Sequence, residues 1–342
     1  QSFKTGWFGV GKKVFITGGA GFIGSNFVKM LLKEPDIDEI RILDKLTYAG
    51  SLDNLKNIID NPNIKFRRGD IVNPNDSADL MRGVNWVINF AAESHVDRSI
   101  HNASPFMKTN VEGVRVLLEL AEDSKPEIFL HISTDEVYGS VESGSTDENS
   151  PLRPSSPYSA SKAAADMICN AYFTSFNVPV IIARSSNNYG PYQYPEKLIP
   201  RFVSLAMDDQ KLPLYGDGKN IRDWLYVEDN CRALLLLLKK GTVGEIYNIG
   251  ASELHPNIQI AEKILAILGK PKNLIDYVKD RLGHDRRYCV NWDKIKNLGW
   301  RPQANFDEQF ANTILWYKNR IDWIKNRTVE AENFYRQILG NN

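Results

Sequence analysis

The amino-acid sequence predicts an α/β protein in which a doubly wound parallel sheet is followed by a smaller, mixed α/β C-terminal lobe. Short apolar runs rich in β-branched residues alternate with segments of helical spacing over roughly the first 190 residues. This alternation is typical of a parallel sheet with helices on both faces. Prolines and glycines then crowd the segment after Tyr189, which indicates a change of organisation at that point.

The expected elements follow one another along the chain. The strands of the large sheet are predicted at Lys13–Thr17, Ile40–Leu43, Ile64–Phe66, Trp86–Phe90, Ile128–Ile132 and Val180–Ala183, with helices at Ser25–Lys33, Val111–Glu122 and Ser159–Phe176. Later segments indicate a helix around Ala233–Leu238, a strand at Glu245–Ile249 and a helix at Ile258–Leu268. We therefore expect a large domain over residues 1–190 and a lobe over residues 191–342, with some of the later chain returning to the large domain.

Charge and cysteine content exclude several classes of function. Lysine plus arginine and aspartate plus glutamate number 42 each, so no overall basic field is present to attract nucleic acid or an acidic membrane surface. The three cysteines are far apart and lack the C-x-x-C spacing of zinc or redox sites, which favours a reducing cytoplasm. His95, His101 and His284 show no metal-ligand spacing, and we expect no metal.

Membrane insertion is not expected either. The longest purely apolar run, Ala233–Leu238, has six residues, whereas a membrane-spanning helix needs about 20. The stretch Gln1–Gly11 lacks the apolar core and small-residue cleavage site of a signal peptide. We interpret it as a leader or an expression remnant.

A glycine-rich turn connects the first expected strand to the first expected helix. Gly18 permits a tight turn, Gly21 lets the backbone approach a pyrophosphate, and Gly24 allows the helix to pack closely on the sheet. The helix N-terminus directs amide hydrogens and a partial positive charge at such an anion. The spacing is G-x-x-G-x-x-G rather than G-x-G-x-x-G, and the strand–turn–helix context predicts a Rossmann-type dinucleotide site.

The residue that closes the second strand indicates which dinucleotide binds. Asp44 stands twenty residues after Gly24, where a carboxylate accepts hydrogen bonds from the adenosine ribose hydroxyls. This favours NAD, although Lys45 beside it offers a charge for a 2′-phosphate. Asp70 and Ile71 follow the third strand and are placed to meet the adenine.

Two further patterns carry chemistry. Tyr158 and Lys162 are four residues apart on an expected helix and so lie one turn apart on the same face. The lysine charge, reinforced by an oxidised nicotinamide, is expected to lower the tyrosine pKa from about 10 toward neutrality, making Tyr158 a base.

Thr134, Asp135 and Glu136 follow the strand Ile128–Ile132, at the edge where doubly wound folds bind ligands. Two adjacent carboxylates suit an elimination, which needs an acid and a base.

The combination of glycine turn and Y-x-x-x-K motif resembles the extended short-chain dehydrogenase/reductase family. The resemblance narrows to its dTDP-glucose 4,6-dehydratase branch on blocks spread from Lys13 to Pro302. These blocks are Ser133–Gly139, Pro154–Lys162, Ser186–Tyr192, Pro195–Pro200, Arg222–Trp224 and Gly283–Tyr288. Leu282 and Cys289 depart from the pattern, where proline and alanine are usual, and they leave the choice between thymine and uracil open.

The resemblance implies a redox-neutral dehydration of a nucleotide sugar. Tyr158 would take the proton of the 4-hydroxyl while hydride passes from carbon 4 to NAD. Glu136 would then abstract the carbon 5 proton as Asp135 protonates the departing 6-hydroxyl, and hydride would return to carbon 6. Thr134 would bond near the 4-hydroxyl.

The resemblance also implies contacts beyond these catalytic residues. Cofactor contacts would come from Gly18, Gly21, Phe22, Ile23, Gly24, Asp44, Lys45, Thr47, Asp70, Ile71, Ala91, Ala92, Tyr158, Lys162 and Asn188. Substrate contacts would come from Ser94, Thr109, Thr134, Asn187, Lys197, Leu198, Pro213, Leu214, Tyr215, Arg222, Asn257, Asp285, Arg286 and Tyr288. For Arg222 and Arg286 taken singly, a surface salt bridge is the alternative interpretation.

The resemblance further implies a homodimer in which Pro105–Glu122 and Ser159–Phe176 of each subunit form a four-helix bundle. The alternative functions are a UDP-sugar 4,6-dehydratase, a 4-epimerase, or a non-catalytic NAD-binding regulator on the same fold. The adjacent Asp135 and Glu136 argue against an epimerase.

Overall fold

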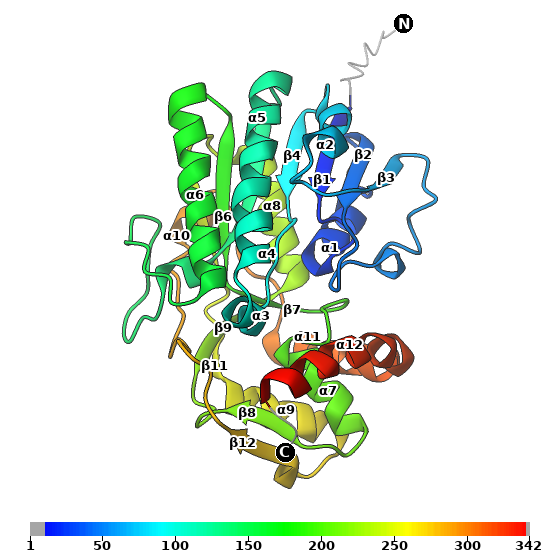
Figure 1. The fold of residues 1–342 in the computed structure, drawn as a ribbon, viewed down its shortest axis with the longest axis vertical. Helices are drawn as coiled ribbons and strands as arrows, with labels where there is room; N and C mark the ends of the chain where they lie inside the picture. The colour runs from blue at the N-terminus through cyan, green and yellow to red at the C-terminus, as the bar shows by residue number, and fades with distance from the viewer. Residues whose placement is uncertain (1–10, 340–342) are drawn as a thin grey trace, which may run out of the picture.

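The computed structural model describes residues 11–339, apart from the side chains of residues 330, 331 and 334–339. The predicted leader or expression remnant therefore lies outside the described residues, except for Gly11. A large α/β domain stands above a smaller lobe in Figure 1, and many but not all of the later strands and helices lie in the lobe.

A seven-stranded sheet in which every neighbouring pair is parallel forms the large domain. Its strand order is β10-β6-β5-β4-β1-β2-β3. The strands are β1 (Lys12–Thr17), β2 (Ile37–Asp44), β3 (Ile64–Arg68), β4 (Trp86–Asn89), β5 (Ile128–Thr134), β6 (Val180–Ser185) and β10 (Ile246–Ile249). The order reverses beside β1, and ligands of doubly wound folds bind at such a point. The predicted fold class is confirmed.

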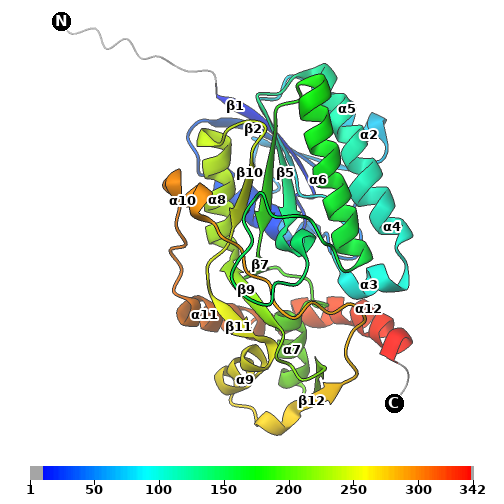
Figure 2. The same cartoon turned by 90° about the vertical axis from the view of Figure 1, so that its left-hand side faces the viewer.

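Helices cover both faces of the sheet, as the turned view in Figure 2 shows. One face carries α1 (Phe22–Leu31), α8 (Val227–Lys240) and α10 (Asp293–Asn297). The other face carries α2 (Pro74–Met81), α5 (Val114–Ser124) and α6 (Pro157–Phe176). Two separate apolar clusters result, one holding Phe27 with Leu234 and the other holding Leu117 with Ala165.

The helix that ends in α5 begins earlier than the range Val111–Glu122 predicted, and within one residue of the start at Pro105 that the resemblance implied. It runs from α4 (Ser104–Phe106) through η2 (Met107–Gly113), which is wound as a π-helix, into α5. π-type turns inside helices are rare and often lie at functional sites. Here Asn110 of η2 bonds the main chain of Glu93 in both directions, at 2.8 and 2.9 Å, and this fixes the segment that follows β4.

The smaller lobe has its own core. A three-stranded sheet of order β11-β9-β7 and a two-stranded sheet of β8 and β12 lie against helices. The strands are β7 (Asn187–Tyr189), β8 (Leu212–Tyr215), β9 (Ile221–Tyr226), β11 (Leu254–Pro256) and β12 (Ile275–Val278), and the helices are α7 (Leu198–Met207), α9 (Asn257–Leu268), α11 (Phe306–Lys318) and α12 (Ile321–Leu339). Phe202, Ile264 and Phe310 are buried together there.

Chain from beyond residue 190 does enter the large domain. The strand β10 pairs with β6, and α8 packs in the same apolar cluster as α1. The division into residues 1–190 and 191–342 remains a prediction, with the return of the later chain to the large domain as part of it. Short segments complete the described chain: α3 (Val96–His101) and the 3-10 turns η1 (Leu52–Asn54), η3 (Asp135–Tyr138) and η4 (Lys272–Leu274).

No helix within residues 11–339 is both long enough and apolar enough to cross a lipid bilayer.

Candidate active site

The glycine turn after β1 has the geometry that its sequence predicted. Gly18 adopts a φ of +70°, and a β-carbon there would come within 2.6 Å of the Ala91 nitrogen. A β-carbon on Gly24 would overlap the carbonyl oxygen of Gly18. Gly21 precedes α1 in an extended conformation, and no side chain of the described residues caps the helix there. The first amides of α1 therefore stay available for an anion.

Most of the predicted cofactor residues line a cavity at the carboxyl edge of the sheet. Its lining includes Gly18, Gly21, Asp44, Lys45, Thr47, Asp70, Ile71, Ala91, Ala92 and Thr109. These residues come from the ends of β1, β2, β3 and β4 and from η2. Phe22 and Ile23 are not part of this lining and instead pack against the apolar core beside α1. Thr109 was predicted near the sugar and lies on this cavity instead.

Asp44 is held by the protein backbone. Its carboxylate accepts hydrogen bonds from the amides of Ala20 at 2.9 Å and Leu46 at 2.8 Å. Burial raises its pKa, and the two backbone bonds oppose the rise. Lys45 is paired with Asp70 at 2.7 Å, so its charge is already compensated. This pairing reduces the attraction that Lys45 offers to a 2′-phosphate and strengthens the preference for NAD.

The end of β5 presents two carboxyl groups in different surroundings. Thr134 caps η3, its hydroxyl accepting from the Glu136 amide at 3.2 Å. Asp135 is 3% exposed, and its Oδ2 has no hydrogen-bond partner among the described residues. Burial raises the Asp135 pKa well above its usual range, and the charges of Glu136 and Asp223 add to the rise. Asp135 is therefore disposed to be a neutral acid, the form that gives a proton.

Glu136 faces cations. Burial raises the pKa of Glu136 as well, but the positive charges of Arg281, Arg222 and Lys197 oppose this effect. The hydroxyl of Tyr288 lies 3.5 Å from its Oε2. Two adjacent carboxyl groups whose surroundings separate their pKa values are suited to act as an acid and a base.

Tyr158 and Lys162 lie on the first turns of α6. A capping box formed by Ser156 and Ser159 fixes this helix start. The ammonium of Lys162 donates to the carbonyl oxygen of Ile132 at 2.6 Å, and burial lowers the pKa of Lys162 to about 8.

The predicted fall of the Tyr158 pKa toward neutrality is not found in the protein by itself. Burial raises that pKa, and the negative charge of Glu136 raises it further. The phenol packs in an apolar cluster with Val96 and Phe106, where a phenolate is poorly solvated.

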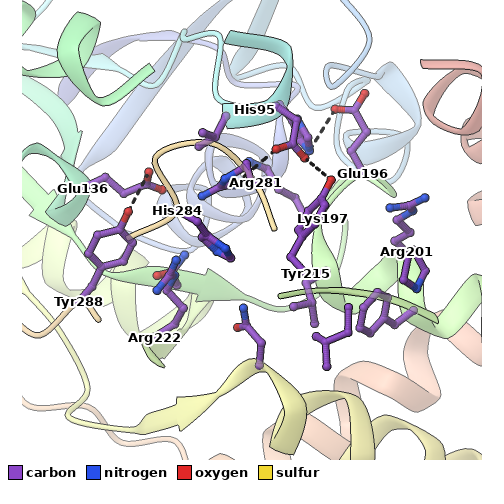
Figure 3. A pocket seen from close by; sticks show the side chains of 18 of the residues that line it. His95, Glu136, Glu196, Lys197, Arg201, Tyr215, Arg222, Arg281, His284 and Tyr288 are labelled. Atoms are coloured by element: carbon purple, nitrogen blue, oxygen red, sulfur yellow. Dashed lines mark hydrogen bonds and ion pairs between the residues drawn. The ribbon is translucent and has the colours of Figure 1, made fainter. Parts of the chain in front are cut away.

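A second cavity, of about 170 Å³, lies between the large domain and the lobe. Figure 3 shows Glu136 and Tyr288 facing each other on one side of it. Nine of the predicted substrate residues line it, namely Asn187, Lys197, Leu198, Pro213, Leu214, Tyr215, Arg222, Asn257 and Tyr288. The lysine and arginine side chains in its lining make the cavity suitable for a diphosphate, because arginine donates paired hydrogen bonds to such oxygens.

Some predicted substrate residues lie outside this cavity. Arg286 forms a surface ion pair with Asp217 at 2.7 Å, and both side chains are half exposed, so its predicted contact with substrate is not supported by its position. Asp285 supports the wall from behind, since its carbonyl accepts from Arg222 at 3.0 Å and its carboxylate from Tyr288 at 2.6 Å. Ser94 acts through its carbonyl, which accepts from Lys197 at 2.7 Å. Asn188, which was predicted to contact the cofactor, donates to the Ser186 carbonyl at 3.0 Å.

The sequence interpretation missed several residues of the cavity wall. They are His95, Asp97, Glu196, Arg201, Arg281 and His284. Arg281 is the most consequential because its charge acts on Glu136. It stands just before the Gly283–Tyr288 block that was singled out, so extending that block by two residues would have found it. Burial lowers the pKa of His284 to about 4, so this imidazole is neutral near pH 7.

Among residues 11–339, no group of three or more histidine, cysteine, aspartate or glutamate side chains is arranged to hold a metal ion.

The fold and the site together define an extended short-chain dehydrogenase/reductase with a tyrosine–lysine pair. The family model for GDP-mannose 4,6 dehydratase matches residues 15–313, and the chain belongs to that family. The chain is 49% identical over 304 residues to the low-salt glycan biosynthesis protein Agl12 of Haloferax volcanii, covering 89% of this chain and 98% of that protein. It is 45% identical over 317 residues to a dTDP-glucose 4,6-dehydratase of Actinoplanes sp., and the match covers 91% of this chain and 99% of that protein.

Solved structures agree with this membership. A dTDP-glucose 4,6-dehydratase from Streptomyces venezuelae, crystallised with NAD and dTDP, is 46% identical and gives a TM-score of 0.91, covering 92% of this chain and 99% of that one. A UDP-glucuronic acid 4-epimerase from Bacillus cereus is 28% identical with a TM-score of 0.85, covering 90% and 99%.

The two arginines predicted to bind substrate give a matched test. Arg222→Ala should weaken binding of dTDP by about 10- to 100-fold, because it removes charge-assisted hydrogen bonds of about 1.5–3 kcal/mol. Arg286→Ala should change the affinity for dTDP by less than about twofold, because this substitution breaks only an exposed ion pair. Isothermal titration calorimetry measures both. Equal losses in the two variants would contradict the positions assigned here.

Proposed function

We propose that this protein converts dTDP-glucose to dTDP-4-keto-6-deoxyglucose, with oxidation at carbon 4 and loss of water across carbons 5 and 6. The observation that carries the proposal is the Asp135 and Glu136 pair, one carboxyl group disposed to stay protonated and the other facing cations, beside Tyr158 and Lys162. The protein is an NAD-dependent hydro-lyase. Its product is a deoxysugar nucleotide.

The first cavity fits NAD. The turn at Gly18 admits a backbone approach that a β-carbon would obstruct, the uncapped start of α1 suits the pyrophosphate, and Asp44 suits the ribose. When bound, NAD accepts a hydride from carbon 4 of the sugar and returns it to carbon 6.

Tyr158 takes the proton of the 4-hydroxyl during the oxidation. Lys162 supplies the positive charge that stabilises the resulting phenolate, which the apolar surroundings of the ring would otherwise disfavour. Thr134 bonds to the sugar near the same hydroxyl. The chain thus provides a base whose activity depends on neighbouring positive charge.

The two carboxyl groups carry out the elimination. The ketone at carbon 4 makes the hydrogen on carbon 5 acidic, and Glu136 removes it as a proton, which it gives back to carbon 5 when hydride is added to carbon 6. Asp135 gives its proton to the 6-hydroxyl, which leaves as water. General acid and base groups of this kind each contribute about 10²- to 10⁴-fold. A 4-epimerase needs no such pair, which is why we favour a dehydratase over an epimerase.

The choice of nucleotide base rests on the relatives. The dTDP-glucose 4,6-dehydratases match over nearly the full chain, which favours thymine over uracil. A non-catalytic regulator would have no need to keep acid, base, tyrosine and lysine together.

Glu136→Gln should separate oxidation from elimination. Because Tyr158 and Lys162 are untouched, dTDP-glucose should still reduce the bound NAD, while the 6-deoxy product should form about 10²- to 10⁴-fold more slowly. Stopped-flow absorbance would show accumulation of NADH, and mass spectrometry would show a 4-keto hexose that keeps its 6-hydroxyl. Asp135→Asn is the matched variant, and its defect should be milder if Glu136 replaces it as acid.

Wild-type formation of the 6-deoxy product in Glu136→Gln would refute this assignment. It would return the epimerase to consideration.

We further propose a homodimer formed through the helices on one face of the sheet. Exposed apolar side chains support this, because Met107 on η2 is 42% exposed and Met167 and Phe176 on α6 are 65% and 50% exposed. Figures 1 and 2 show α5 and α6 side by side along that face. Such side chains on neighbouring helices suit a four-helix interface.

Met167→Asp should convert the dimer to a monomer of 38.8 kDa, because a charge would be buried in the interface. Val329→Asp is the matched control, since Val329 is also 65% exposed but lies on α12. Sedimentation equilibrium distinguishes the masses. A wild type that is monomeric at micromolar concentration, or a dimer unaffected by Met167→Asp, would contradict the interface.

We also place the protein in a reducing cytoplasm. Its three cysteines support this, because Cys169, Cys231 and Cys289 are all free thiols.

A further inference from the structure

A buried cluster of charged residues lies behind the catalytic lysine and has no part in the mechanism described above. Asp166 follows Lys162 by four residues on α6, so Tyr158, Lys162 and Asp166 occupy successive turns of one helix face. All three are buried, and Asp166 is fully inaccessible to solvent. A carboxylate is almost never fully buried unless it is paired, so this position requires an explanation.

The partners of Asp166 come from the sheet beneath α6. Arg184 of β6 donates its Nε to Asp166 Oδ2 at 2.8 Å. His131 of β5 has its Nε2 at 3.7 Å from the other oxygen, Oδ1. Among the described residues, Oδ1 has no hydrogen-bond partner. One carboxylate oxygen is thus engaged by Arg184, while the other is not fixed by a hydrogen bond of ordinary geometry.

The ionisable groups around Lys162 come from three elements, and most of them are neutral. Burial raises the pKa of the Tyr158 phenol and that of the Cys169 thiol. Burial lowers the pKa of His131 well below its usual range, and the nearby charge of Lys162 adds to this. The charged groups of this cluster are therefore Lys162, Arg184 and Asp166. Asp166 is its single anion.

The hydrogen bond of Lys162 does not supply a countercharge. Its ammonium donates to the neutral carbonyl of Ile132. Burial of the ammonium lowers its pKa to about 8, and the largest opposing influence is the charge of Asp166. Burial raises the pKa of Asp166 itself, while the charge of Arg184, a hydrogen bond from Ser133 and the charge of Lys162 oppose that rise.

We propose that Asp166 is a positioning residue for the reaction, its negative charge favouring the ammonium form of Lys162 beside Tyr158 from the next turn of α6. The role rests on the proposed function, because it matters only if Lys162 must stay positive while Tyr158 carries the proton of the substrate. The alternative is a purely structural ion pair with Arg184.

The network beyond Arg184 explains how the carboxylate is fixed. Arg184 also donates to the Tyr138 hydroxyl at 2.8 Å, and that hydroxyl donates to Asn248 of β10 at 2.8 Å. The cluster is thus connected across β6 to the edge strand contributed by the later part of the chain. A carboxylate anchored in this way cannot swing away when Lys162 changes its charge.

The pH dependence of hydride transfer separates the positioning role from the structural one. Lys162 must be protonated to stabilise the phenolate, so the rate falls as pH rises through the Lys162 pKa. Asp166→Asn removes the opposing charge and lowers that pKa, by about one unit or more for an opposite charge at short range. The alkaline limb of single-turnover NAD reduction by dTDP-glucose should therefore move down by about one pH unit, giving an about fivefold loss near pH 8 that approaches about tenfold at higher pH.

Two further variants control for disruption of the ion pair. Arg184→Met breaks the same pair but leaves Asp166 to act on Lys162, so its alkaline limb should stay in place or move to higher pH. The double variant Asp166→Asn/Arg184→Met removes both members of the ion pair and leaves no buried guanidinium without its partner, so it should fold even if Asp166→Asn alone does not. The alkaline limb of the double variant should move to lower pH, as it does in Asp166→Asn. Asp166→Glu keeps a negative charge near Lys162, so its alkaline limb should lie closer to that of the wild type than the limb of Asp166→Asn does.

Stopped-flow measurements from about pH 6 to about pH 9.5 cover the relevant range. An unchanged alkaline limb in both variants that lack Asp166, with an active wild type, would overturn the positioning role. A wild type that gave neither NAD reduction nor 6-deoxy product would instead overturn the proposed function itself.

Discussion

A parallel sheet brings the carboxyl ends of its strands to one edge, and every functional segment of this protein depends on that constraint. The glycine turn follows β1, Asp44 ends β2, Asp70 follows β3 and the two catalytic carboxyl groups follow β5. Segments more than 100 residues apart in the sequence therefore face the same pair of cavities. The small lobe then covers this edge and contributes the cationic wall. Burial at the edge follows from the architecture before any chemistry is considered.

Burial in turn sets the protonation of the catalytic groups. It disfavours charge on Asp135, on the Tyr158 phenol and on Lys162 alike. Neighbouring charge distinguishes Asp135 from Glu136, because the carboxylates of Glu136 and Asp223 raise the pKa of Asp135 further, whereas the cations Arg281, Arg222 and Lys197 oppose the rise at Glu136. An acid and a base result from two adjacent residues of the same chemical type. The cost of burying these groups is offset by the large apolar clusters on both faces of the sheet.

The sequence predicted those parts of the site that lie within one element. The glycine spacing and the four-residue spacing of Tyr158 and Lys162 are local patterns, and helix geometry alone places the latter pair on one face. The strand near Glu245–Ile249 was predicted as well, but its place beside β6 depends on tertiary packing that periodicity does not encode.

Side chains in irregular segments were harder to place. Arg281 and Arg286 are five residues apart in a segment without regular periodicity, and one faces the cavity while the other faces solvent. Asp166 lay within a predicted helix, but its significance depends on Arg184, which reaches it only when α6 packs on β6. The Tyr158 pKa could not be predicted from the lysine spacing, because burial by Val96 and Phe106 outweighs that neighbour.

The most direct test of the account is the fate of the hydrogen on carbon 4. The protein should be incubated with dTDP-glucose that carries deuterium at carbon 4, and the product analysed by NMR and mass spectrometry. Transfer through NAD within one active site predicts a 4-keto-6-deoxy product with the deuterium on carbon 6. Deuterium returned to carbon 4 of a hexose that keeps its 6-hydroxyl, or lost to free NADH, would contradict it.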